Sequence, residues 1–219
     1  MKVLIIGANG QVGKHLVKKI QNTDSIKAKA MIRQTEQAAF FEDLGAETVL
    51  VDLESDTKQI EAAAKDVDAV VFTAGSGPHT GPDKTMLIDL DAAIKSIKAT
   101  QNAGVQRYIM ISSFDTTREA IQSAISEAPN FAPYVVAKHY ADDWLRKTDL
   151  KYTIIHPGLL TNDRGIGKVE AAETVGRNEI PREDVAEVIL ACLEDESTIH
   201  KEFQVVSGEQ TVKNAIESL

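Results

Sequence analysis

The chain has 219 residues, of which 43% are hydrophobic and 26% are charged, and this composition excludes disordered and collagen-like chains. Its 33 acidic and 24 basic side chains give a formal net charge of −9 at pH 7, and lysine and arginine form no basic tract. Nucleic acid is therefore not expected as a partner, because affinity for its phosphates comes mainly from clustered cations. A chain of this length predicts a single domain that spans residues 1–219.

The only cysteine, Cys192, excludes an intrachain disulfide, as is typical of a reducing compartment. The first apolar run, at residues 3–6, is too short for the core of a signal peptide or for a membrane span. The five histidines are dispersed and show no spacing typical of a metal site, so no metal is expected. We therefore predict a cytoplasmic protein that binds neither membranes nor metals and that is a monomer or a homodimer.

Short apolar runs alternate with helical patterns along the whole chain. The runs that predict strands lie at residues 3–6, 26–32, 48–51, 69–72, 107–112, 152–155 and 203–206. Periodic segments between them predict helices near residues 15–20, 36–44, 60–64, 84–103, 133–147 and 181–193, with a short helix at the C-terminus. The first run is apolar throughout, as in a parallel strand covered on both faces. We expect a three-layer α/β fold, with a doubly wound parallel sheet of about seven strands and a small C-terminal substrate region.

Three glycines at a spacing of three residues, Gly7, Gly10 and Gly13, stand where the first strand turns into the first helix. Glycine permits positive φ in the turn, lets the backbone approach a pyrophosphate, and lets the helix pack closely on the strand. The N-terminus of the helix then offers unpaired N–H groups and a partial positive charge to an anion. A structural turn could have the same spacing, but its place in a βαβ unit favours a dinucleotide site. The neighbouring loop residues assigned to that site are Asn9, Gln11 and Val12.

The residue about twenty positions after the last glycine distinguishes NAD from NADP, because an acid there binds the ribose 2′-hydroxyl and repels a 2′-phosphate. Arg33 stands at this position, at the end of the second strand, where its guanidinium can hold a phosphate. We therefore predict a preference for NADP(H) over NAD(H), although a solvated arginine at a helix entrance would look the same in sequence. Further cofactor contacts are expected beyond the third and fourth strands, from Asp52, Leu53, Ala74 and Gly75.

Tyr134 and Lys138 are four residues apart on a predicted helix, which places them on one face, one turn apart. An ammonium beside a phenol favours the phenolate form, so the pair suits a general acid/base. Ser112 and Ser113 end the fifth strand, and only one of them can face the substrate because adjacent strand residues point to opposite sides. The tyrosine–lysine spacing alone is weak, since it also arises by chance. The order along the chain, from glycine loop to serines to this pair, strengthens the interpretation.

With these motifs in place, the sequence resembles the short-chain dehydrogenase/reductase superfamily. Most specifically it is similar to the compact atypical members, which are NAD(P)-binding, epimerase/dehydratase-like or reductase proteins. The likeness covers essentially the whole chain. Beside the glycine loop, the matching segments are Ala74-Gly75, Ser112-Ser113, Tyr134-x-x-x-Lys138, His156-Pro157-Gly158 and the run at residues 182–186. The resemblance implies a Rossmann fold and hydride transfer at C4 of the nicotinamide.

The resemblance also implies a role for each matching residue. Tyr134 would be the proton donor or acceptor, Lys138 would tune it and orient the cofactor ribose, and Ser113 would bind the substrate oxygen. Pro157 and Gly158 would contact the cofactor. The implied function is an NADP(H)-dependent oxidoreductase that acts on a small carbonyl or conjugated substrate.

Asp89 stands where the family usually has an asparagine, within the long helix expected at 84–103. The substitution puts a complete proton relay in question, and Asp89 could instead be a polar group at the helix flank. Two alternatives therefore stay open: a non-catalytic NADP(H)-binding redox sensor, and an epimerase or dehydratase with a retained cofactor. The chain after His156 is too short for the large lobe that holds a nucleotide sugar, so we expect the substrate-side elements at residues 114–131 and 159–180.

Overall fold

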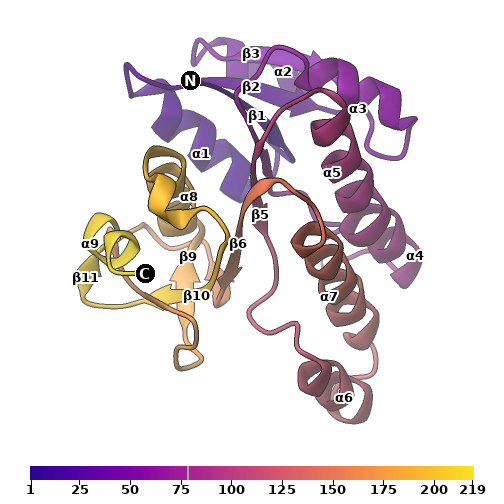
Figure 1. The fold of residues 1–219 in the computed structure, drawn as a ribbon, viewed down its shortest axis with the longest axis vertical. Coiled ribbons are helices and arrows are strands. Elements are labelled where there is room, and N and C mark those ends of the chain that lie inside the picture. Colours follow the sequence, from indigo (N-terminus) through magenta and orange to yellow (C-terminus); the bar gives the residue numbers. More distant parts are fainter. Residues whose placement is uncertain (78) are drawn as a thin grey trace.

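Residues 1–77 and 79–219 are described by a computed structural model, in which a nine-stranded sheet lies between two layers of helices (Figure 1). The strand order is β11-β8-β10-β6-β5-β4-β1-β2-β3. The strands of this sheet are β1 (Lys2–Ile6), β2 (Lys27–Ile32), β3 (Glu47–Leu50), β4 (Ala69–Phe72), β5 (Arg107–Ile111), β6 (Lys151–Pro157), β8 (Lys168–Ala172), β10 (Lys201–Ser207) and β11 (Gln210–Thr211). Two short strands outside it pair in parallel, β7 (Leu159–Thr161) and β9 (Glu179–Pro181).

The strands from β10 to β3 in this order are all parallel to one another. The expected three-layer, doubly wound α/β fold is therefore confirmed. The sheet has more strands than the expected seven, because two further strands lie beyond β10: β8 pairs antiparallel with β10, and β11 pairs antiparallel with β8. Val169 is the one fully buried side chain of β8, so this segment lacks the continuous apolar run that marks the parallel strands.

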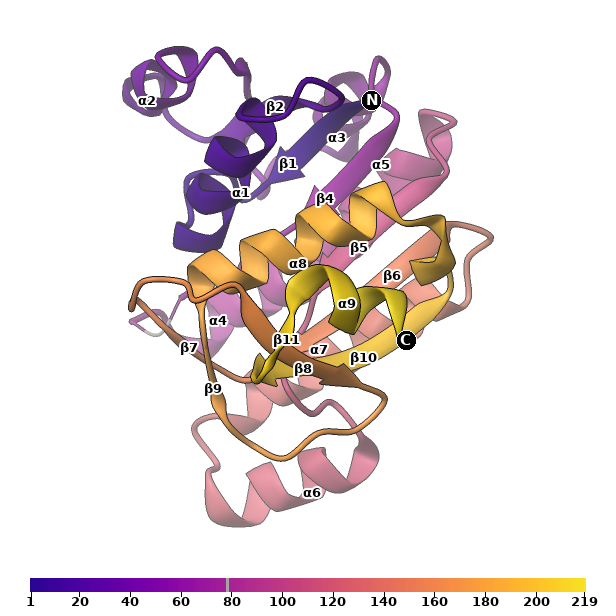
Figure 2. The ribbon, with the colours of Figure 1, turned by 90° about the vertical axis from the view of Figure 1, so that its left-hand side faces the viewer.

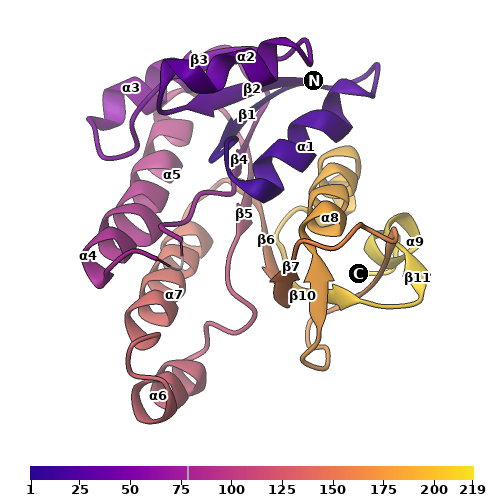
Figure 3. The ribbon, with the colours of Figure 1, turned by 180° about the vertical axis from the view of Figure 1, so that it is seen from behind.

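Helices cover both faces of the sheet (Figure 1). One layer contains α1 (Gln11–Gln21), α8 (Arg182–Glu194) and α9 (Val212–Glu217), and α8 packs against both of the others (Figure 2). The opposite layer contains α3 (Thr57–Ala64), α5 (Ala93–Asn102) and α7 (Ala132–Arg146) (Figure 3). Within residues 1–77 and 79–219, no helix has the length and apolar character needed to cross a membrane.

The sheet separates two hydrophobic cores, and β1 contributes to both. Val3 and Ile5 lie in the core that contains side chains of α1 and α8, whereas Leu4 and Ile6 lie in the core that contains side chains of α3 and α7. All four side chains are fully buried. A strand with two buried faces must be apolar throughout, so polar groups for a site can come only from the strand ends and the segments beyond them.

Two helical regions differ from the sequence-based expectation. Helix α6 (Arg118–Glu127) lies in a region without a clear helical pattern, where only Ile121 and Ala124 are buried, against α7. The helix expected at 84–103 is not uniform, because a π-helical stretch, η2 (Thr85–Ala92), precedes α5. The remaining short helices are η1 (Thr35–Gln37), α2 (Ala38–Glu42), α4 (Pro82–Lys84) and η3 (Glu196–Thr198).

Candidate cofactor and active site

The glycine turn between β1 and α1 brings the end of β1 against the end of β4. Gly7 has φ +88°, and a Cβ on it would lie 2.6 Å from the backbone nitrogen of Ala74. A Cβ on Gly13 would lie 2.5 Å from the carbonyl oxygen of Gly7, so only glycine allows α1 to start this close to the strand. The N–H of Gly10 donates to the carbonyl oxygen of Gly7 at 2.9 Å and closes the turn.

The N-terminus of α1 has the features of an anion site. Among the described residues, no side chain caps its first turn, and no acidic residue lies in that turn. The first N–H groups of a helix have no intrahelical partner and carry a partial positive charge. Together with the tight glycine turn, this end of α1 fits the pyrophosphate of a dinucleotide.

A cleft of about 440 Å³, which we call the cofactor cleft, opens beside the glycine turn at the carboxyl ends of β1 to β4. Ligands of doubly wound folds bind at this end of the sheet, and the volume lies in the usual range for small-molecule sites. The residues predicted for the cofactor that line it are Gly7, Asn9, Gly10, Arg33, Asp52, Leu53, Ala74 and Gly75. The described residues predicted for the cofactor that do not line it are Gln11, Val12, Gly13, Lys138, Pro157 and Gly158.

Arg33 lies at the exposed rim of the cofactor cleft, just beyond β2. Its backbone N–H donates to the side chain of Gln37 at 3.0 Å, and among the described residues no acidic side chain pairs with its guanidinium. The other cation of the cleft, Lys84, is already paired with Glu54 at 2.6 Å. Oδ1 of Asp52 accepts the N–H of Glu54 at 2.9 Å and shapes the turn after β3. Arg33 is therefore the cation of this cleft that is available to an anion.

Lys138 is buried on α7, and its ammonium lies beside Tyr134. Nζ is 5.8 Å from the centre of the Tyr134 ring, and it donates to the carbonyl oxygen of Ile111 at 3.3 Å. Oδ1 of Asp89 is 3.5 Å away. Burial by itself lowers the pKa of this lysine, but the nearby charges of Tyr134, Asp89 and Asp142 outweigh burial and raise it. The side chain therefore keeps its positive charge at neutral pH.

Asp89 connects Lys138 to the loop that follows β4. Its side chain is fully buried. Oδ2 accepts the N–H of Ser76 at 3.1 Å, and Oδ1 lies over Gly75, where a Cβ would be only 3.2 Å away. The π-helical stretch η2 carries Asp89, and such stretches occur often at functional sites. Asp89 thus ties Lys138 to a wall of the cofactor cleft.

The two serines after β5 have different partners. Ser112 is buried, and its hydroxyl donates to Oδ2 of Asp142 at 2.7 Å. Ser113 is half-buried, and its carbonyl oxygen accepts a hydrogen bond from Nδ1 of His156 at 2.5 Å. Among the described residues, the hydroxyl of Ser113 has no hydrogen-bond partner. Of the two hydroxyl groups, the one of Ser113 is therefore available to a ligand.

Gly158 has a structural reason to be glycine. A Cβ there would lie 2.1 Å from the carbonyl oxygen of Asn178, so the segment that leads into β9 passes directly against it. Its N–H donates to the carbonyl oxygen of Val205 at 2.9 Å. Pro157 and Gly158 thus join β6 to the pair of strands β7 and β9, and their contact with a cofactor stays a prediction.

The loop after β7 is attached to the beginning of α8. Oδ2 and Oδ1 of Asp184 accept the N–H groups of Ile166 at 3.0 Å and Gly167 at 2.9 Å. Glu183 accepts the N–H of Gly165 at 3.0 Å. Because two carboxylates bind three consecutive N–H groups, this part of the loop has a defined position at α8.

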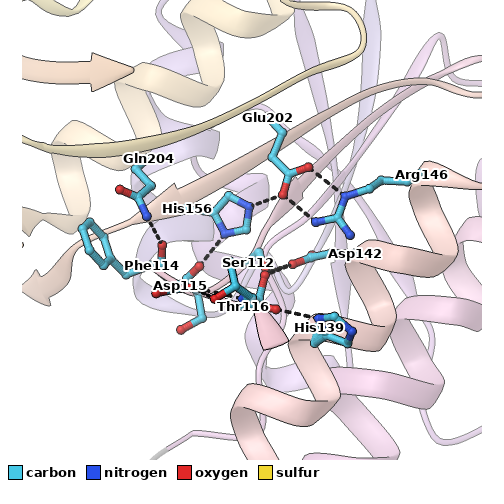
Figure 4. Close-up of polar contacts among 12 residues, drawn as sticks. Ser112, Phe114, Asp115, Thr116, His139, Asp142, Arg146, His156, Glu202 and Gln204 are labelled. Atoms are coloured by element: carbon cyan, nitrogen blue, oxygen red, sulfur yellow. Dashed lines mark hydrogen bonds and ion pairs between the residues drawn. The ribbon is translucent and has the colours of Figure 1, made fainter. Parts of the chain in front are cut away.

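A group of charged side chains that the sequence analysis missed lies behind the serines (Figure 4). Nε2 of His156 is 2.8 Å from Oε1 of Glu202 on β10. Glu202 also accepts two hydrogen bonds from Arg146 of α7, at 2.6 and 2.8 Å. Burial alone raises the pKa of Glu202, but the hydrogen bonds from Arg146 and His156 lower it to about 2. We call Asp142, Arg146, His156 and Glu202 the buried charge network. In the sequence, the feature that pointed to this network was a histidine, His156, at the end of an apolar strand.

Three members of this network have the spacing of a metal site, because ligand atoms of Asp142, His156 and Glu202 lie within 4.8 Å of one another. Both oxygens of Glu202, however, accept hydrogen bonds from Arg146. Both ring nitrogens of His156 face oxygen acceptors, whereas a metal ligand must present a lone pair to the ion. We therefore interpret the group as hydrogen-bonded charges.

The fold, the glycine turn and the cleft define a Rossmann-type protein that binds a nicotinamide dinucleotide. The chain belongs to the NAD(P)H-binding family, which it matches over residues 7–196. The uncharacterized sugar epimerase YhfK of Bacillus subtilis is 45% identical to it over 220 residues, which is 100% of each chain. These matches, together with the structures below, confirm the resemblance to atypical short-chain dehydrogenases/reductases, so the protein is one of an oxidoreductase/epimerase-like family.

Two solved structures share the fold over the whole chain. A Bacillus halodurans protein provisionally assigned as an NAD-dependent epimerase/dehydratase is 39% identical, with a TM-score of 0.91 and 100% of both chains covered. The oxidoreductase ylbE from Lactococcus lactis is 30% identical, with a TM-score of 0.89, and the match covers 100% of this chain and 96% of that one.

Proposed function

We propose that the protein is an NADP(H)-dependent oxidoreductase that transfers a hydride between the nicotinamide and a small carbonyl or conjugated substrate. The observation that carries the proposal is the position of Lys138, a buried ammonium within reach of both Asp89 and Tyr134 and next to a wall of the cofactor cleft. A buried lysine that keeps its charge beside a half-buried phenol stabilises the phenolate. A general acid of the tyrosine type needs this stabilisation.

In this proposal each residue of the group has one task. Tyr134 donates a proton to the substrate oxygen, and Lys138 stabilises the phenolate that remains. When bound, the reduced nicotinamide supplies the hydride to the carbonyl carbon, so that the C=O group becomes an alcohol. Ser113 holds the substrate oxygen with its free hydroxyl, and Asp89 keeps Lys138 in place. In the reverse direction the same tyrosine takes up the proton.

The proposed preference for NADP(H) over NAD(H) rests on Arg33. Its guanidinium lies at the exposed rim of the cofactor cleft and has no acidic partner among the described residues. A guanidinium can bind a phosphate group with two hydrogen bonds, and neither of the two residues directly after β2, Arg33 and Gln34, is an acid that could bind a 2′-hydroxyl instead. The first turn of α1 contributes its N–H groups to the pyrophosphate through Gln11, Val12 and Gly13.

A second candidate function, an epimerase or dehydratase with a retained cofactor, is favoured by the names of two relatives. In that reaction the hydride returns to the substrate, so no net NADPH is consumed. The ion pair of Asp89 with Lys138 favours a third candidate, a redox sensor without catalysis. The negative charge of the carboxylate offsets part of the positive charge of the lysine, so Lys138 stabilises a negative charge on Tyr134 less.

The test is NADPH consumption with a panel of aldehydes, ketones, quinones and conjugated carbonyl compounds. Tyr134→Phe is expected to lower kcat by about 100-fold or more at an unchanged dissociation constant for NADPH, because it removes the acid and leaves the cleft intact. Tyr140→Phe is the matched control, since Tyr140 lies on the exposed side of the same helix. A wild-type protein that consumes no NADPH, or a fully active Tyr134→Phe variant, would contradict the proposal. Nucleotide that copurifies without net consumption would favour the epimerase.

We further propose that the chain forms one domain, residues 1–219, in which residues 114–131 and 159–180 contact the substrate. Apolar side chains are exposed in both regions: Phe131, Leu159 and Ile166 are 50%, 74% and 61% exposed. They would contact an apolar part of the substrate. We also propose that the protein is cytoplasmic and that it is a monomer or a homodimer.

A further inference from the structure

The segment that follows β5, residues 112–116, is held by side chains from three other elements (Figure 4). Two of its hydroxyl groups, those of Ser112 and Thr116, donate to one oxygen of Asp142 on α7, at 2.7 and 2.8 Å. Three of its backbone carbonyl oxygens also face side-chain nitrogens of other elements. The nitrogen-to-oxygen distances are 2.6 Å from His139 to Thr116, 2.5 Å from His156 to Ser113 and 2.9 Å from Gln204 to Phe114.

Among these side chains, His156 is bound at both ends. Nδ1 faces the carbonyl oxygen of Ser113, and Nε2 faces the carboxylate of Glu202 at 2.8 Å. A carbonyl oxygen and an ionised carboxylate can only accept hydrogen bonds. Both ring nitrogens must therefore carry a proton, which makes this side chain an imidazolium.

Charged side chains from two elements surround His156. Asp142 and Arg146 come from α7, with Lys138 one turn before Asp142 on the same helix, and Glu202 comes from β10. Burial raises the pKa of Asp142, so the imidazolium has its hydrogen-bonded counter-charge in Glu202, which also binds the guanidinium. His156 is 5% exposed, and a neutral ring there would leave a buried acceptor without a donor.

We propose that His156 is a positioning residue whose imidazolium holds the carbonyl group of Ser113 and thereby fixes the place of the backbone that carries the Ser113 hydroxyl. This inference rests on the proposed function for the role of Ser113 as the group that binds the substrate oxygen. The carbonyl belongs to the planar peptide between Ser113 and Phe114, so this peptide can turn only if the bond to His156 breaks. A small misplacement of a substrate-binding group lowers the rate although His156 itself does not touch the substrate.

Glu202 and Arg146 support the imidazolium from the other side. The guanidinium of Arg146 binds both oxygens of Glu202 and so fixes the carboxylate that orients the ring of His156. Carboxylates orient histidine side chains in the same way in metal and catalytic sites. A chain of charge-assisted hydrogen bonds therefore connects Ser113 to the last turn of α7.

Two substitutions separate the two ends of the imidazole. His156→Asn keeps an N–H near the position of Nδ1 and gives up the contact with Glu202, whereas His156→Gln reaches toward Glu202 and gives up the donor to Ser113. We expect His156→Gln to lower kcat/KM for the carbonyl substrate about tenfold or more at an unchanged dissociation constant for NADPH. His156→Asn should restore most of that loss. Equal losses in the two variants, or no loss in either, would overturn the proposal.

A double-mutant cycle tests whether the loss passes through Ser113. In a Ser113→Ala background there is no hydroxyl left to position, so adding His156→Gln should lower kcat/KM by no more than about twofold. The same loss in both backgrounds would mean that His156 acts independently of Ser113, and the proposal would be wrong.

Two measurements without substrate separate a failure of this proposal from a failure of the proposed function. ¹⁵N NMR of the wild-type protein should show both ring nitrogens of His156 protonated at neutral pH. Hydrogen exchange of the amides at 113–117 should be about tenfold faster in His156→Gln than in the wild type. His200→Asn is the matched control, because His200 is exposed and has φ 61°, a conformation that asparagine adopts readily.

A neutral ring in the wild type, or unchanged exchange in His156→Gln, would overturn the positioning role. The NMR result does not depend on any variant, so it decides the question even where His156→Gln does not fold. A protein that passes both measurements but reduces no carbonyl compound would support the positioning of Ser113 and overturn the oxidoreductase function alone.

Discussion

The cofactor cleft and the buried charge network are built by different means. The cleft is built around the glycine turn, at the ends of four neighbouring strands, where the backbone at Gly7 and the backbone at Ala74 approach closely. The network is made by side chains of α7, β6 and β10, and His156 and Glu202 are 46 positions apart in the chain. A backbone site is sensitive to any added Cβ at its close approaches, whereas a side-chain site is sensitive to the charge of its members.

The largest effect is expected from an added methyl group in the glycine turn. Gly13→Ala would put a Cβ 2.5 Å from the carbonyl oxygen of Gly7 and 2.6 Å from that of Ala8. We expect the free energy of unfolding to fall by about 3 kcal/mol or more, because backbone must move to relieve the overlap, and NADPH binding to be lost. Urea unfolding and calorimetry measure the two effects. Gly176→Ala is the control, since a Cβ at Gly176 meets nothing within 4 Å. Equal stability of the two variants would contradict a cleft built by close backbone contact.

Charge reversal at Arg33 tests the one side chain on which the cofactor preference depends. In Arg33→Asp the 2′-phosphate of NADPH loses its cation and meets a like charge, so NADPH affinity should fall about 30- to 100-fold, or ~2–3 kcal/mol. NADH affinity should stay the same or rise. Titration calorimetry with both cofactors measures the change, and an unchanged affinity for NADPH would refute the assignment of Arg33.

The buried charge network predicts that the free energy of unfolding falls both at acidic pH and at alkaline pH. The pKa of Glu202 is lowered from 4.5 to about 2, so its contribution is complete above the unfolded value and is lost as pH falls toward 2. Glu202 is partly exposed, and after solvent screening we expect this loss to amount to about 1–2 kcal/mol. The pKa of His156 is raised above 6.5: burial lowers it, but the hydrogen bond to Glu202 and the charge of Asp142 outweigh burial. Its contribution is therefore complete below that value and is lost as pH rises through the folded-state pKa.

Urea unfolding across this pH range measures both losses. Glu202→Gln should reduce the loss of unfolding free energy at acidic pH, and His156→Asn should reduce the loss at alkaline pH. The NADPH affinity should not change in either variant. Glu173→Gln, at an exposed position outside the network, is the control. If the two network variants keep the wild-type pH dependence, the charges do not stabilise this half of the protein.

The smallest effect is expected at the surface ion pair in the cofactor cleft. Lys84 donates to both oxygens of Glu54, at 2.6 and 2.8 Å. Glu54→Gln should free the lysine's charge and tighten NADPH binding about two- to threefold at low salt, with the gain lost at high salt because exposed charges are screened. Glu61→Gln, on α3, is the matched control. A gain that is independent of salt would argue against an electrostatic cause.

Structural features that depend on a few neighbouring residues could be predicted from the spacing of residues in the sequence. The alternation of apolar runs and helices predicted the parallel sheet, and the glycines predicted a turn with positive φ at Gly7, because burial period and backbone conformation are local properties. Strands β8 and β11 and helix α6 were missed, because each buries few side chains and so leaves a weak period. The burial of Asp89 was not predicted, because the π-helical stretch that carries it has no signature in the periodicity.

Local spacing was therefore sufficient for the fold class, for the glycine turn between β1 and α1, and for the nearness of Tyr134 and Lys138 on one face of α7. Folding of the chain was needed to bring Ser112 to Asp142 across 30 positions and His156 to Glu202 across 46. The charge state of such buried groups follows from the partners that surround them, and those partners come from separate elements. No window of sequence contains that information, because it exists only once α7, β6 and β10 are packed together.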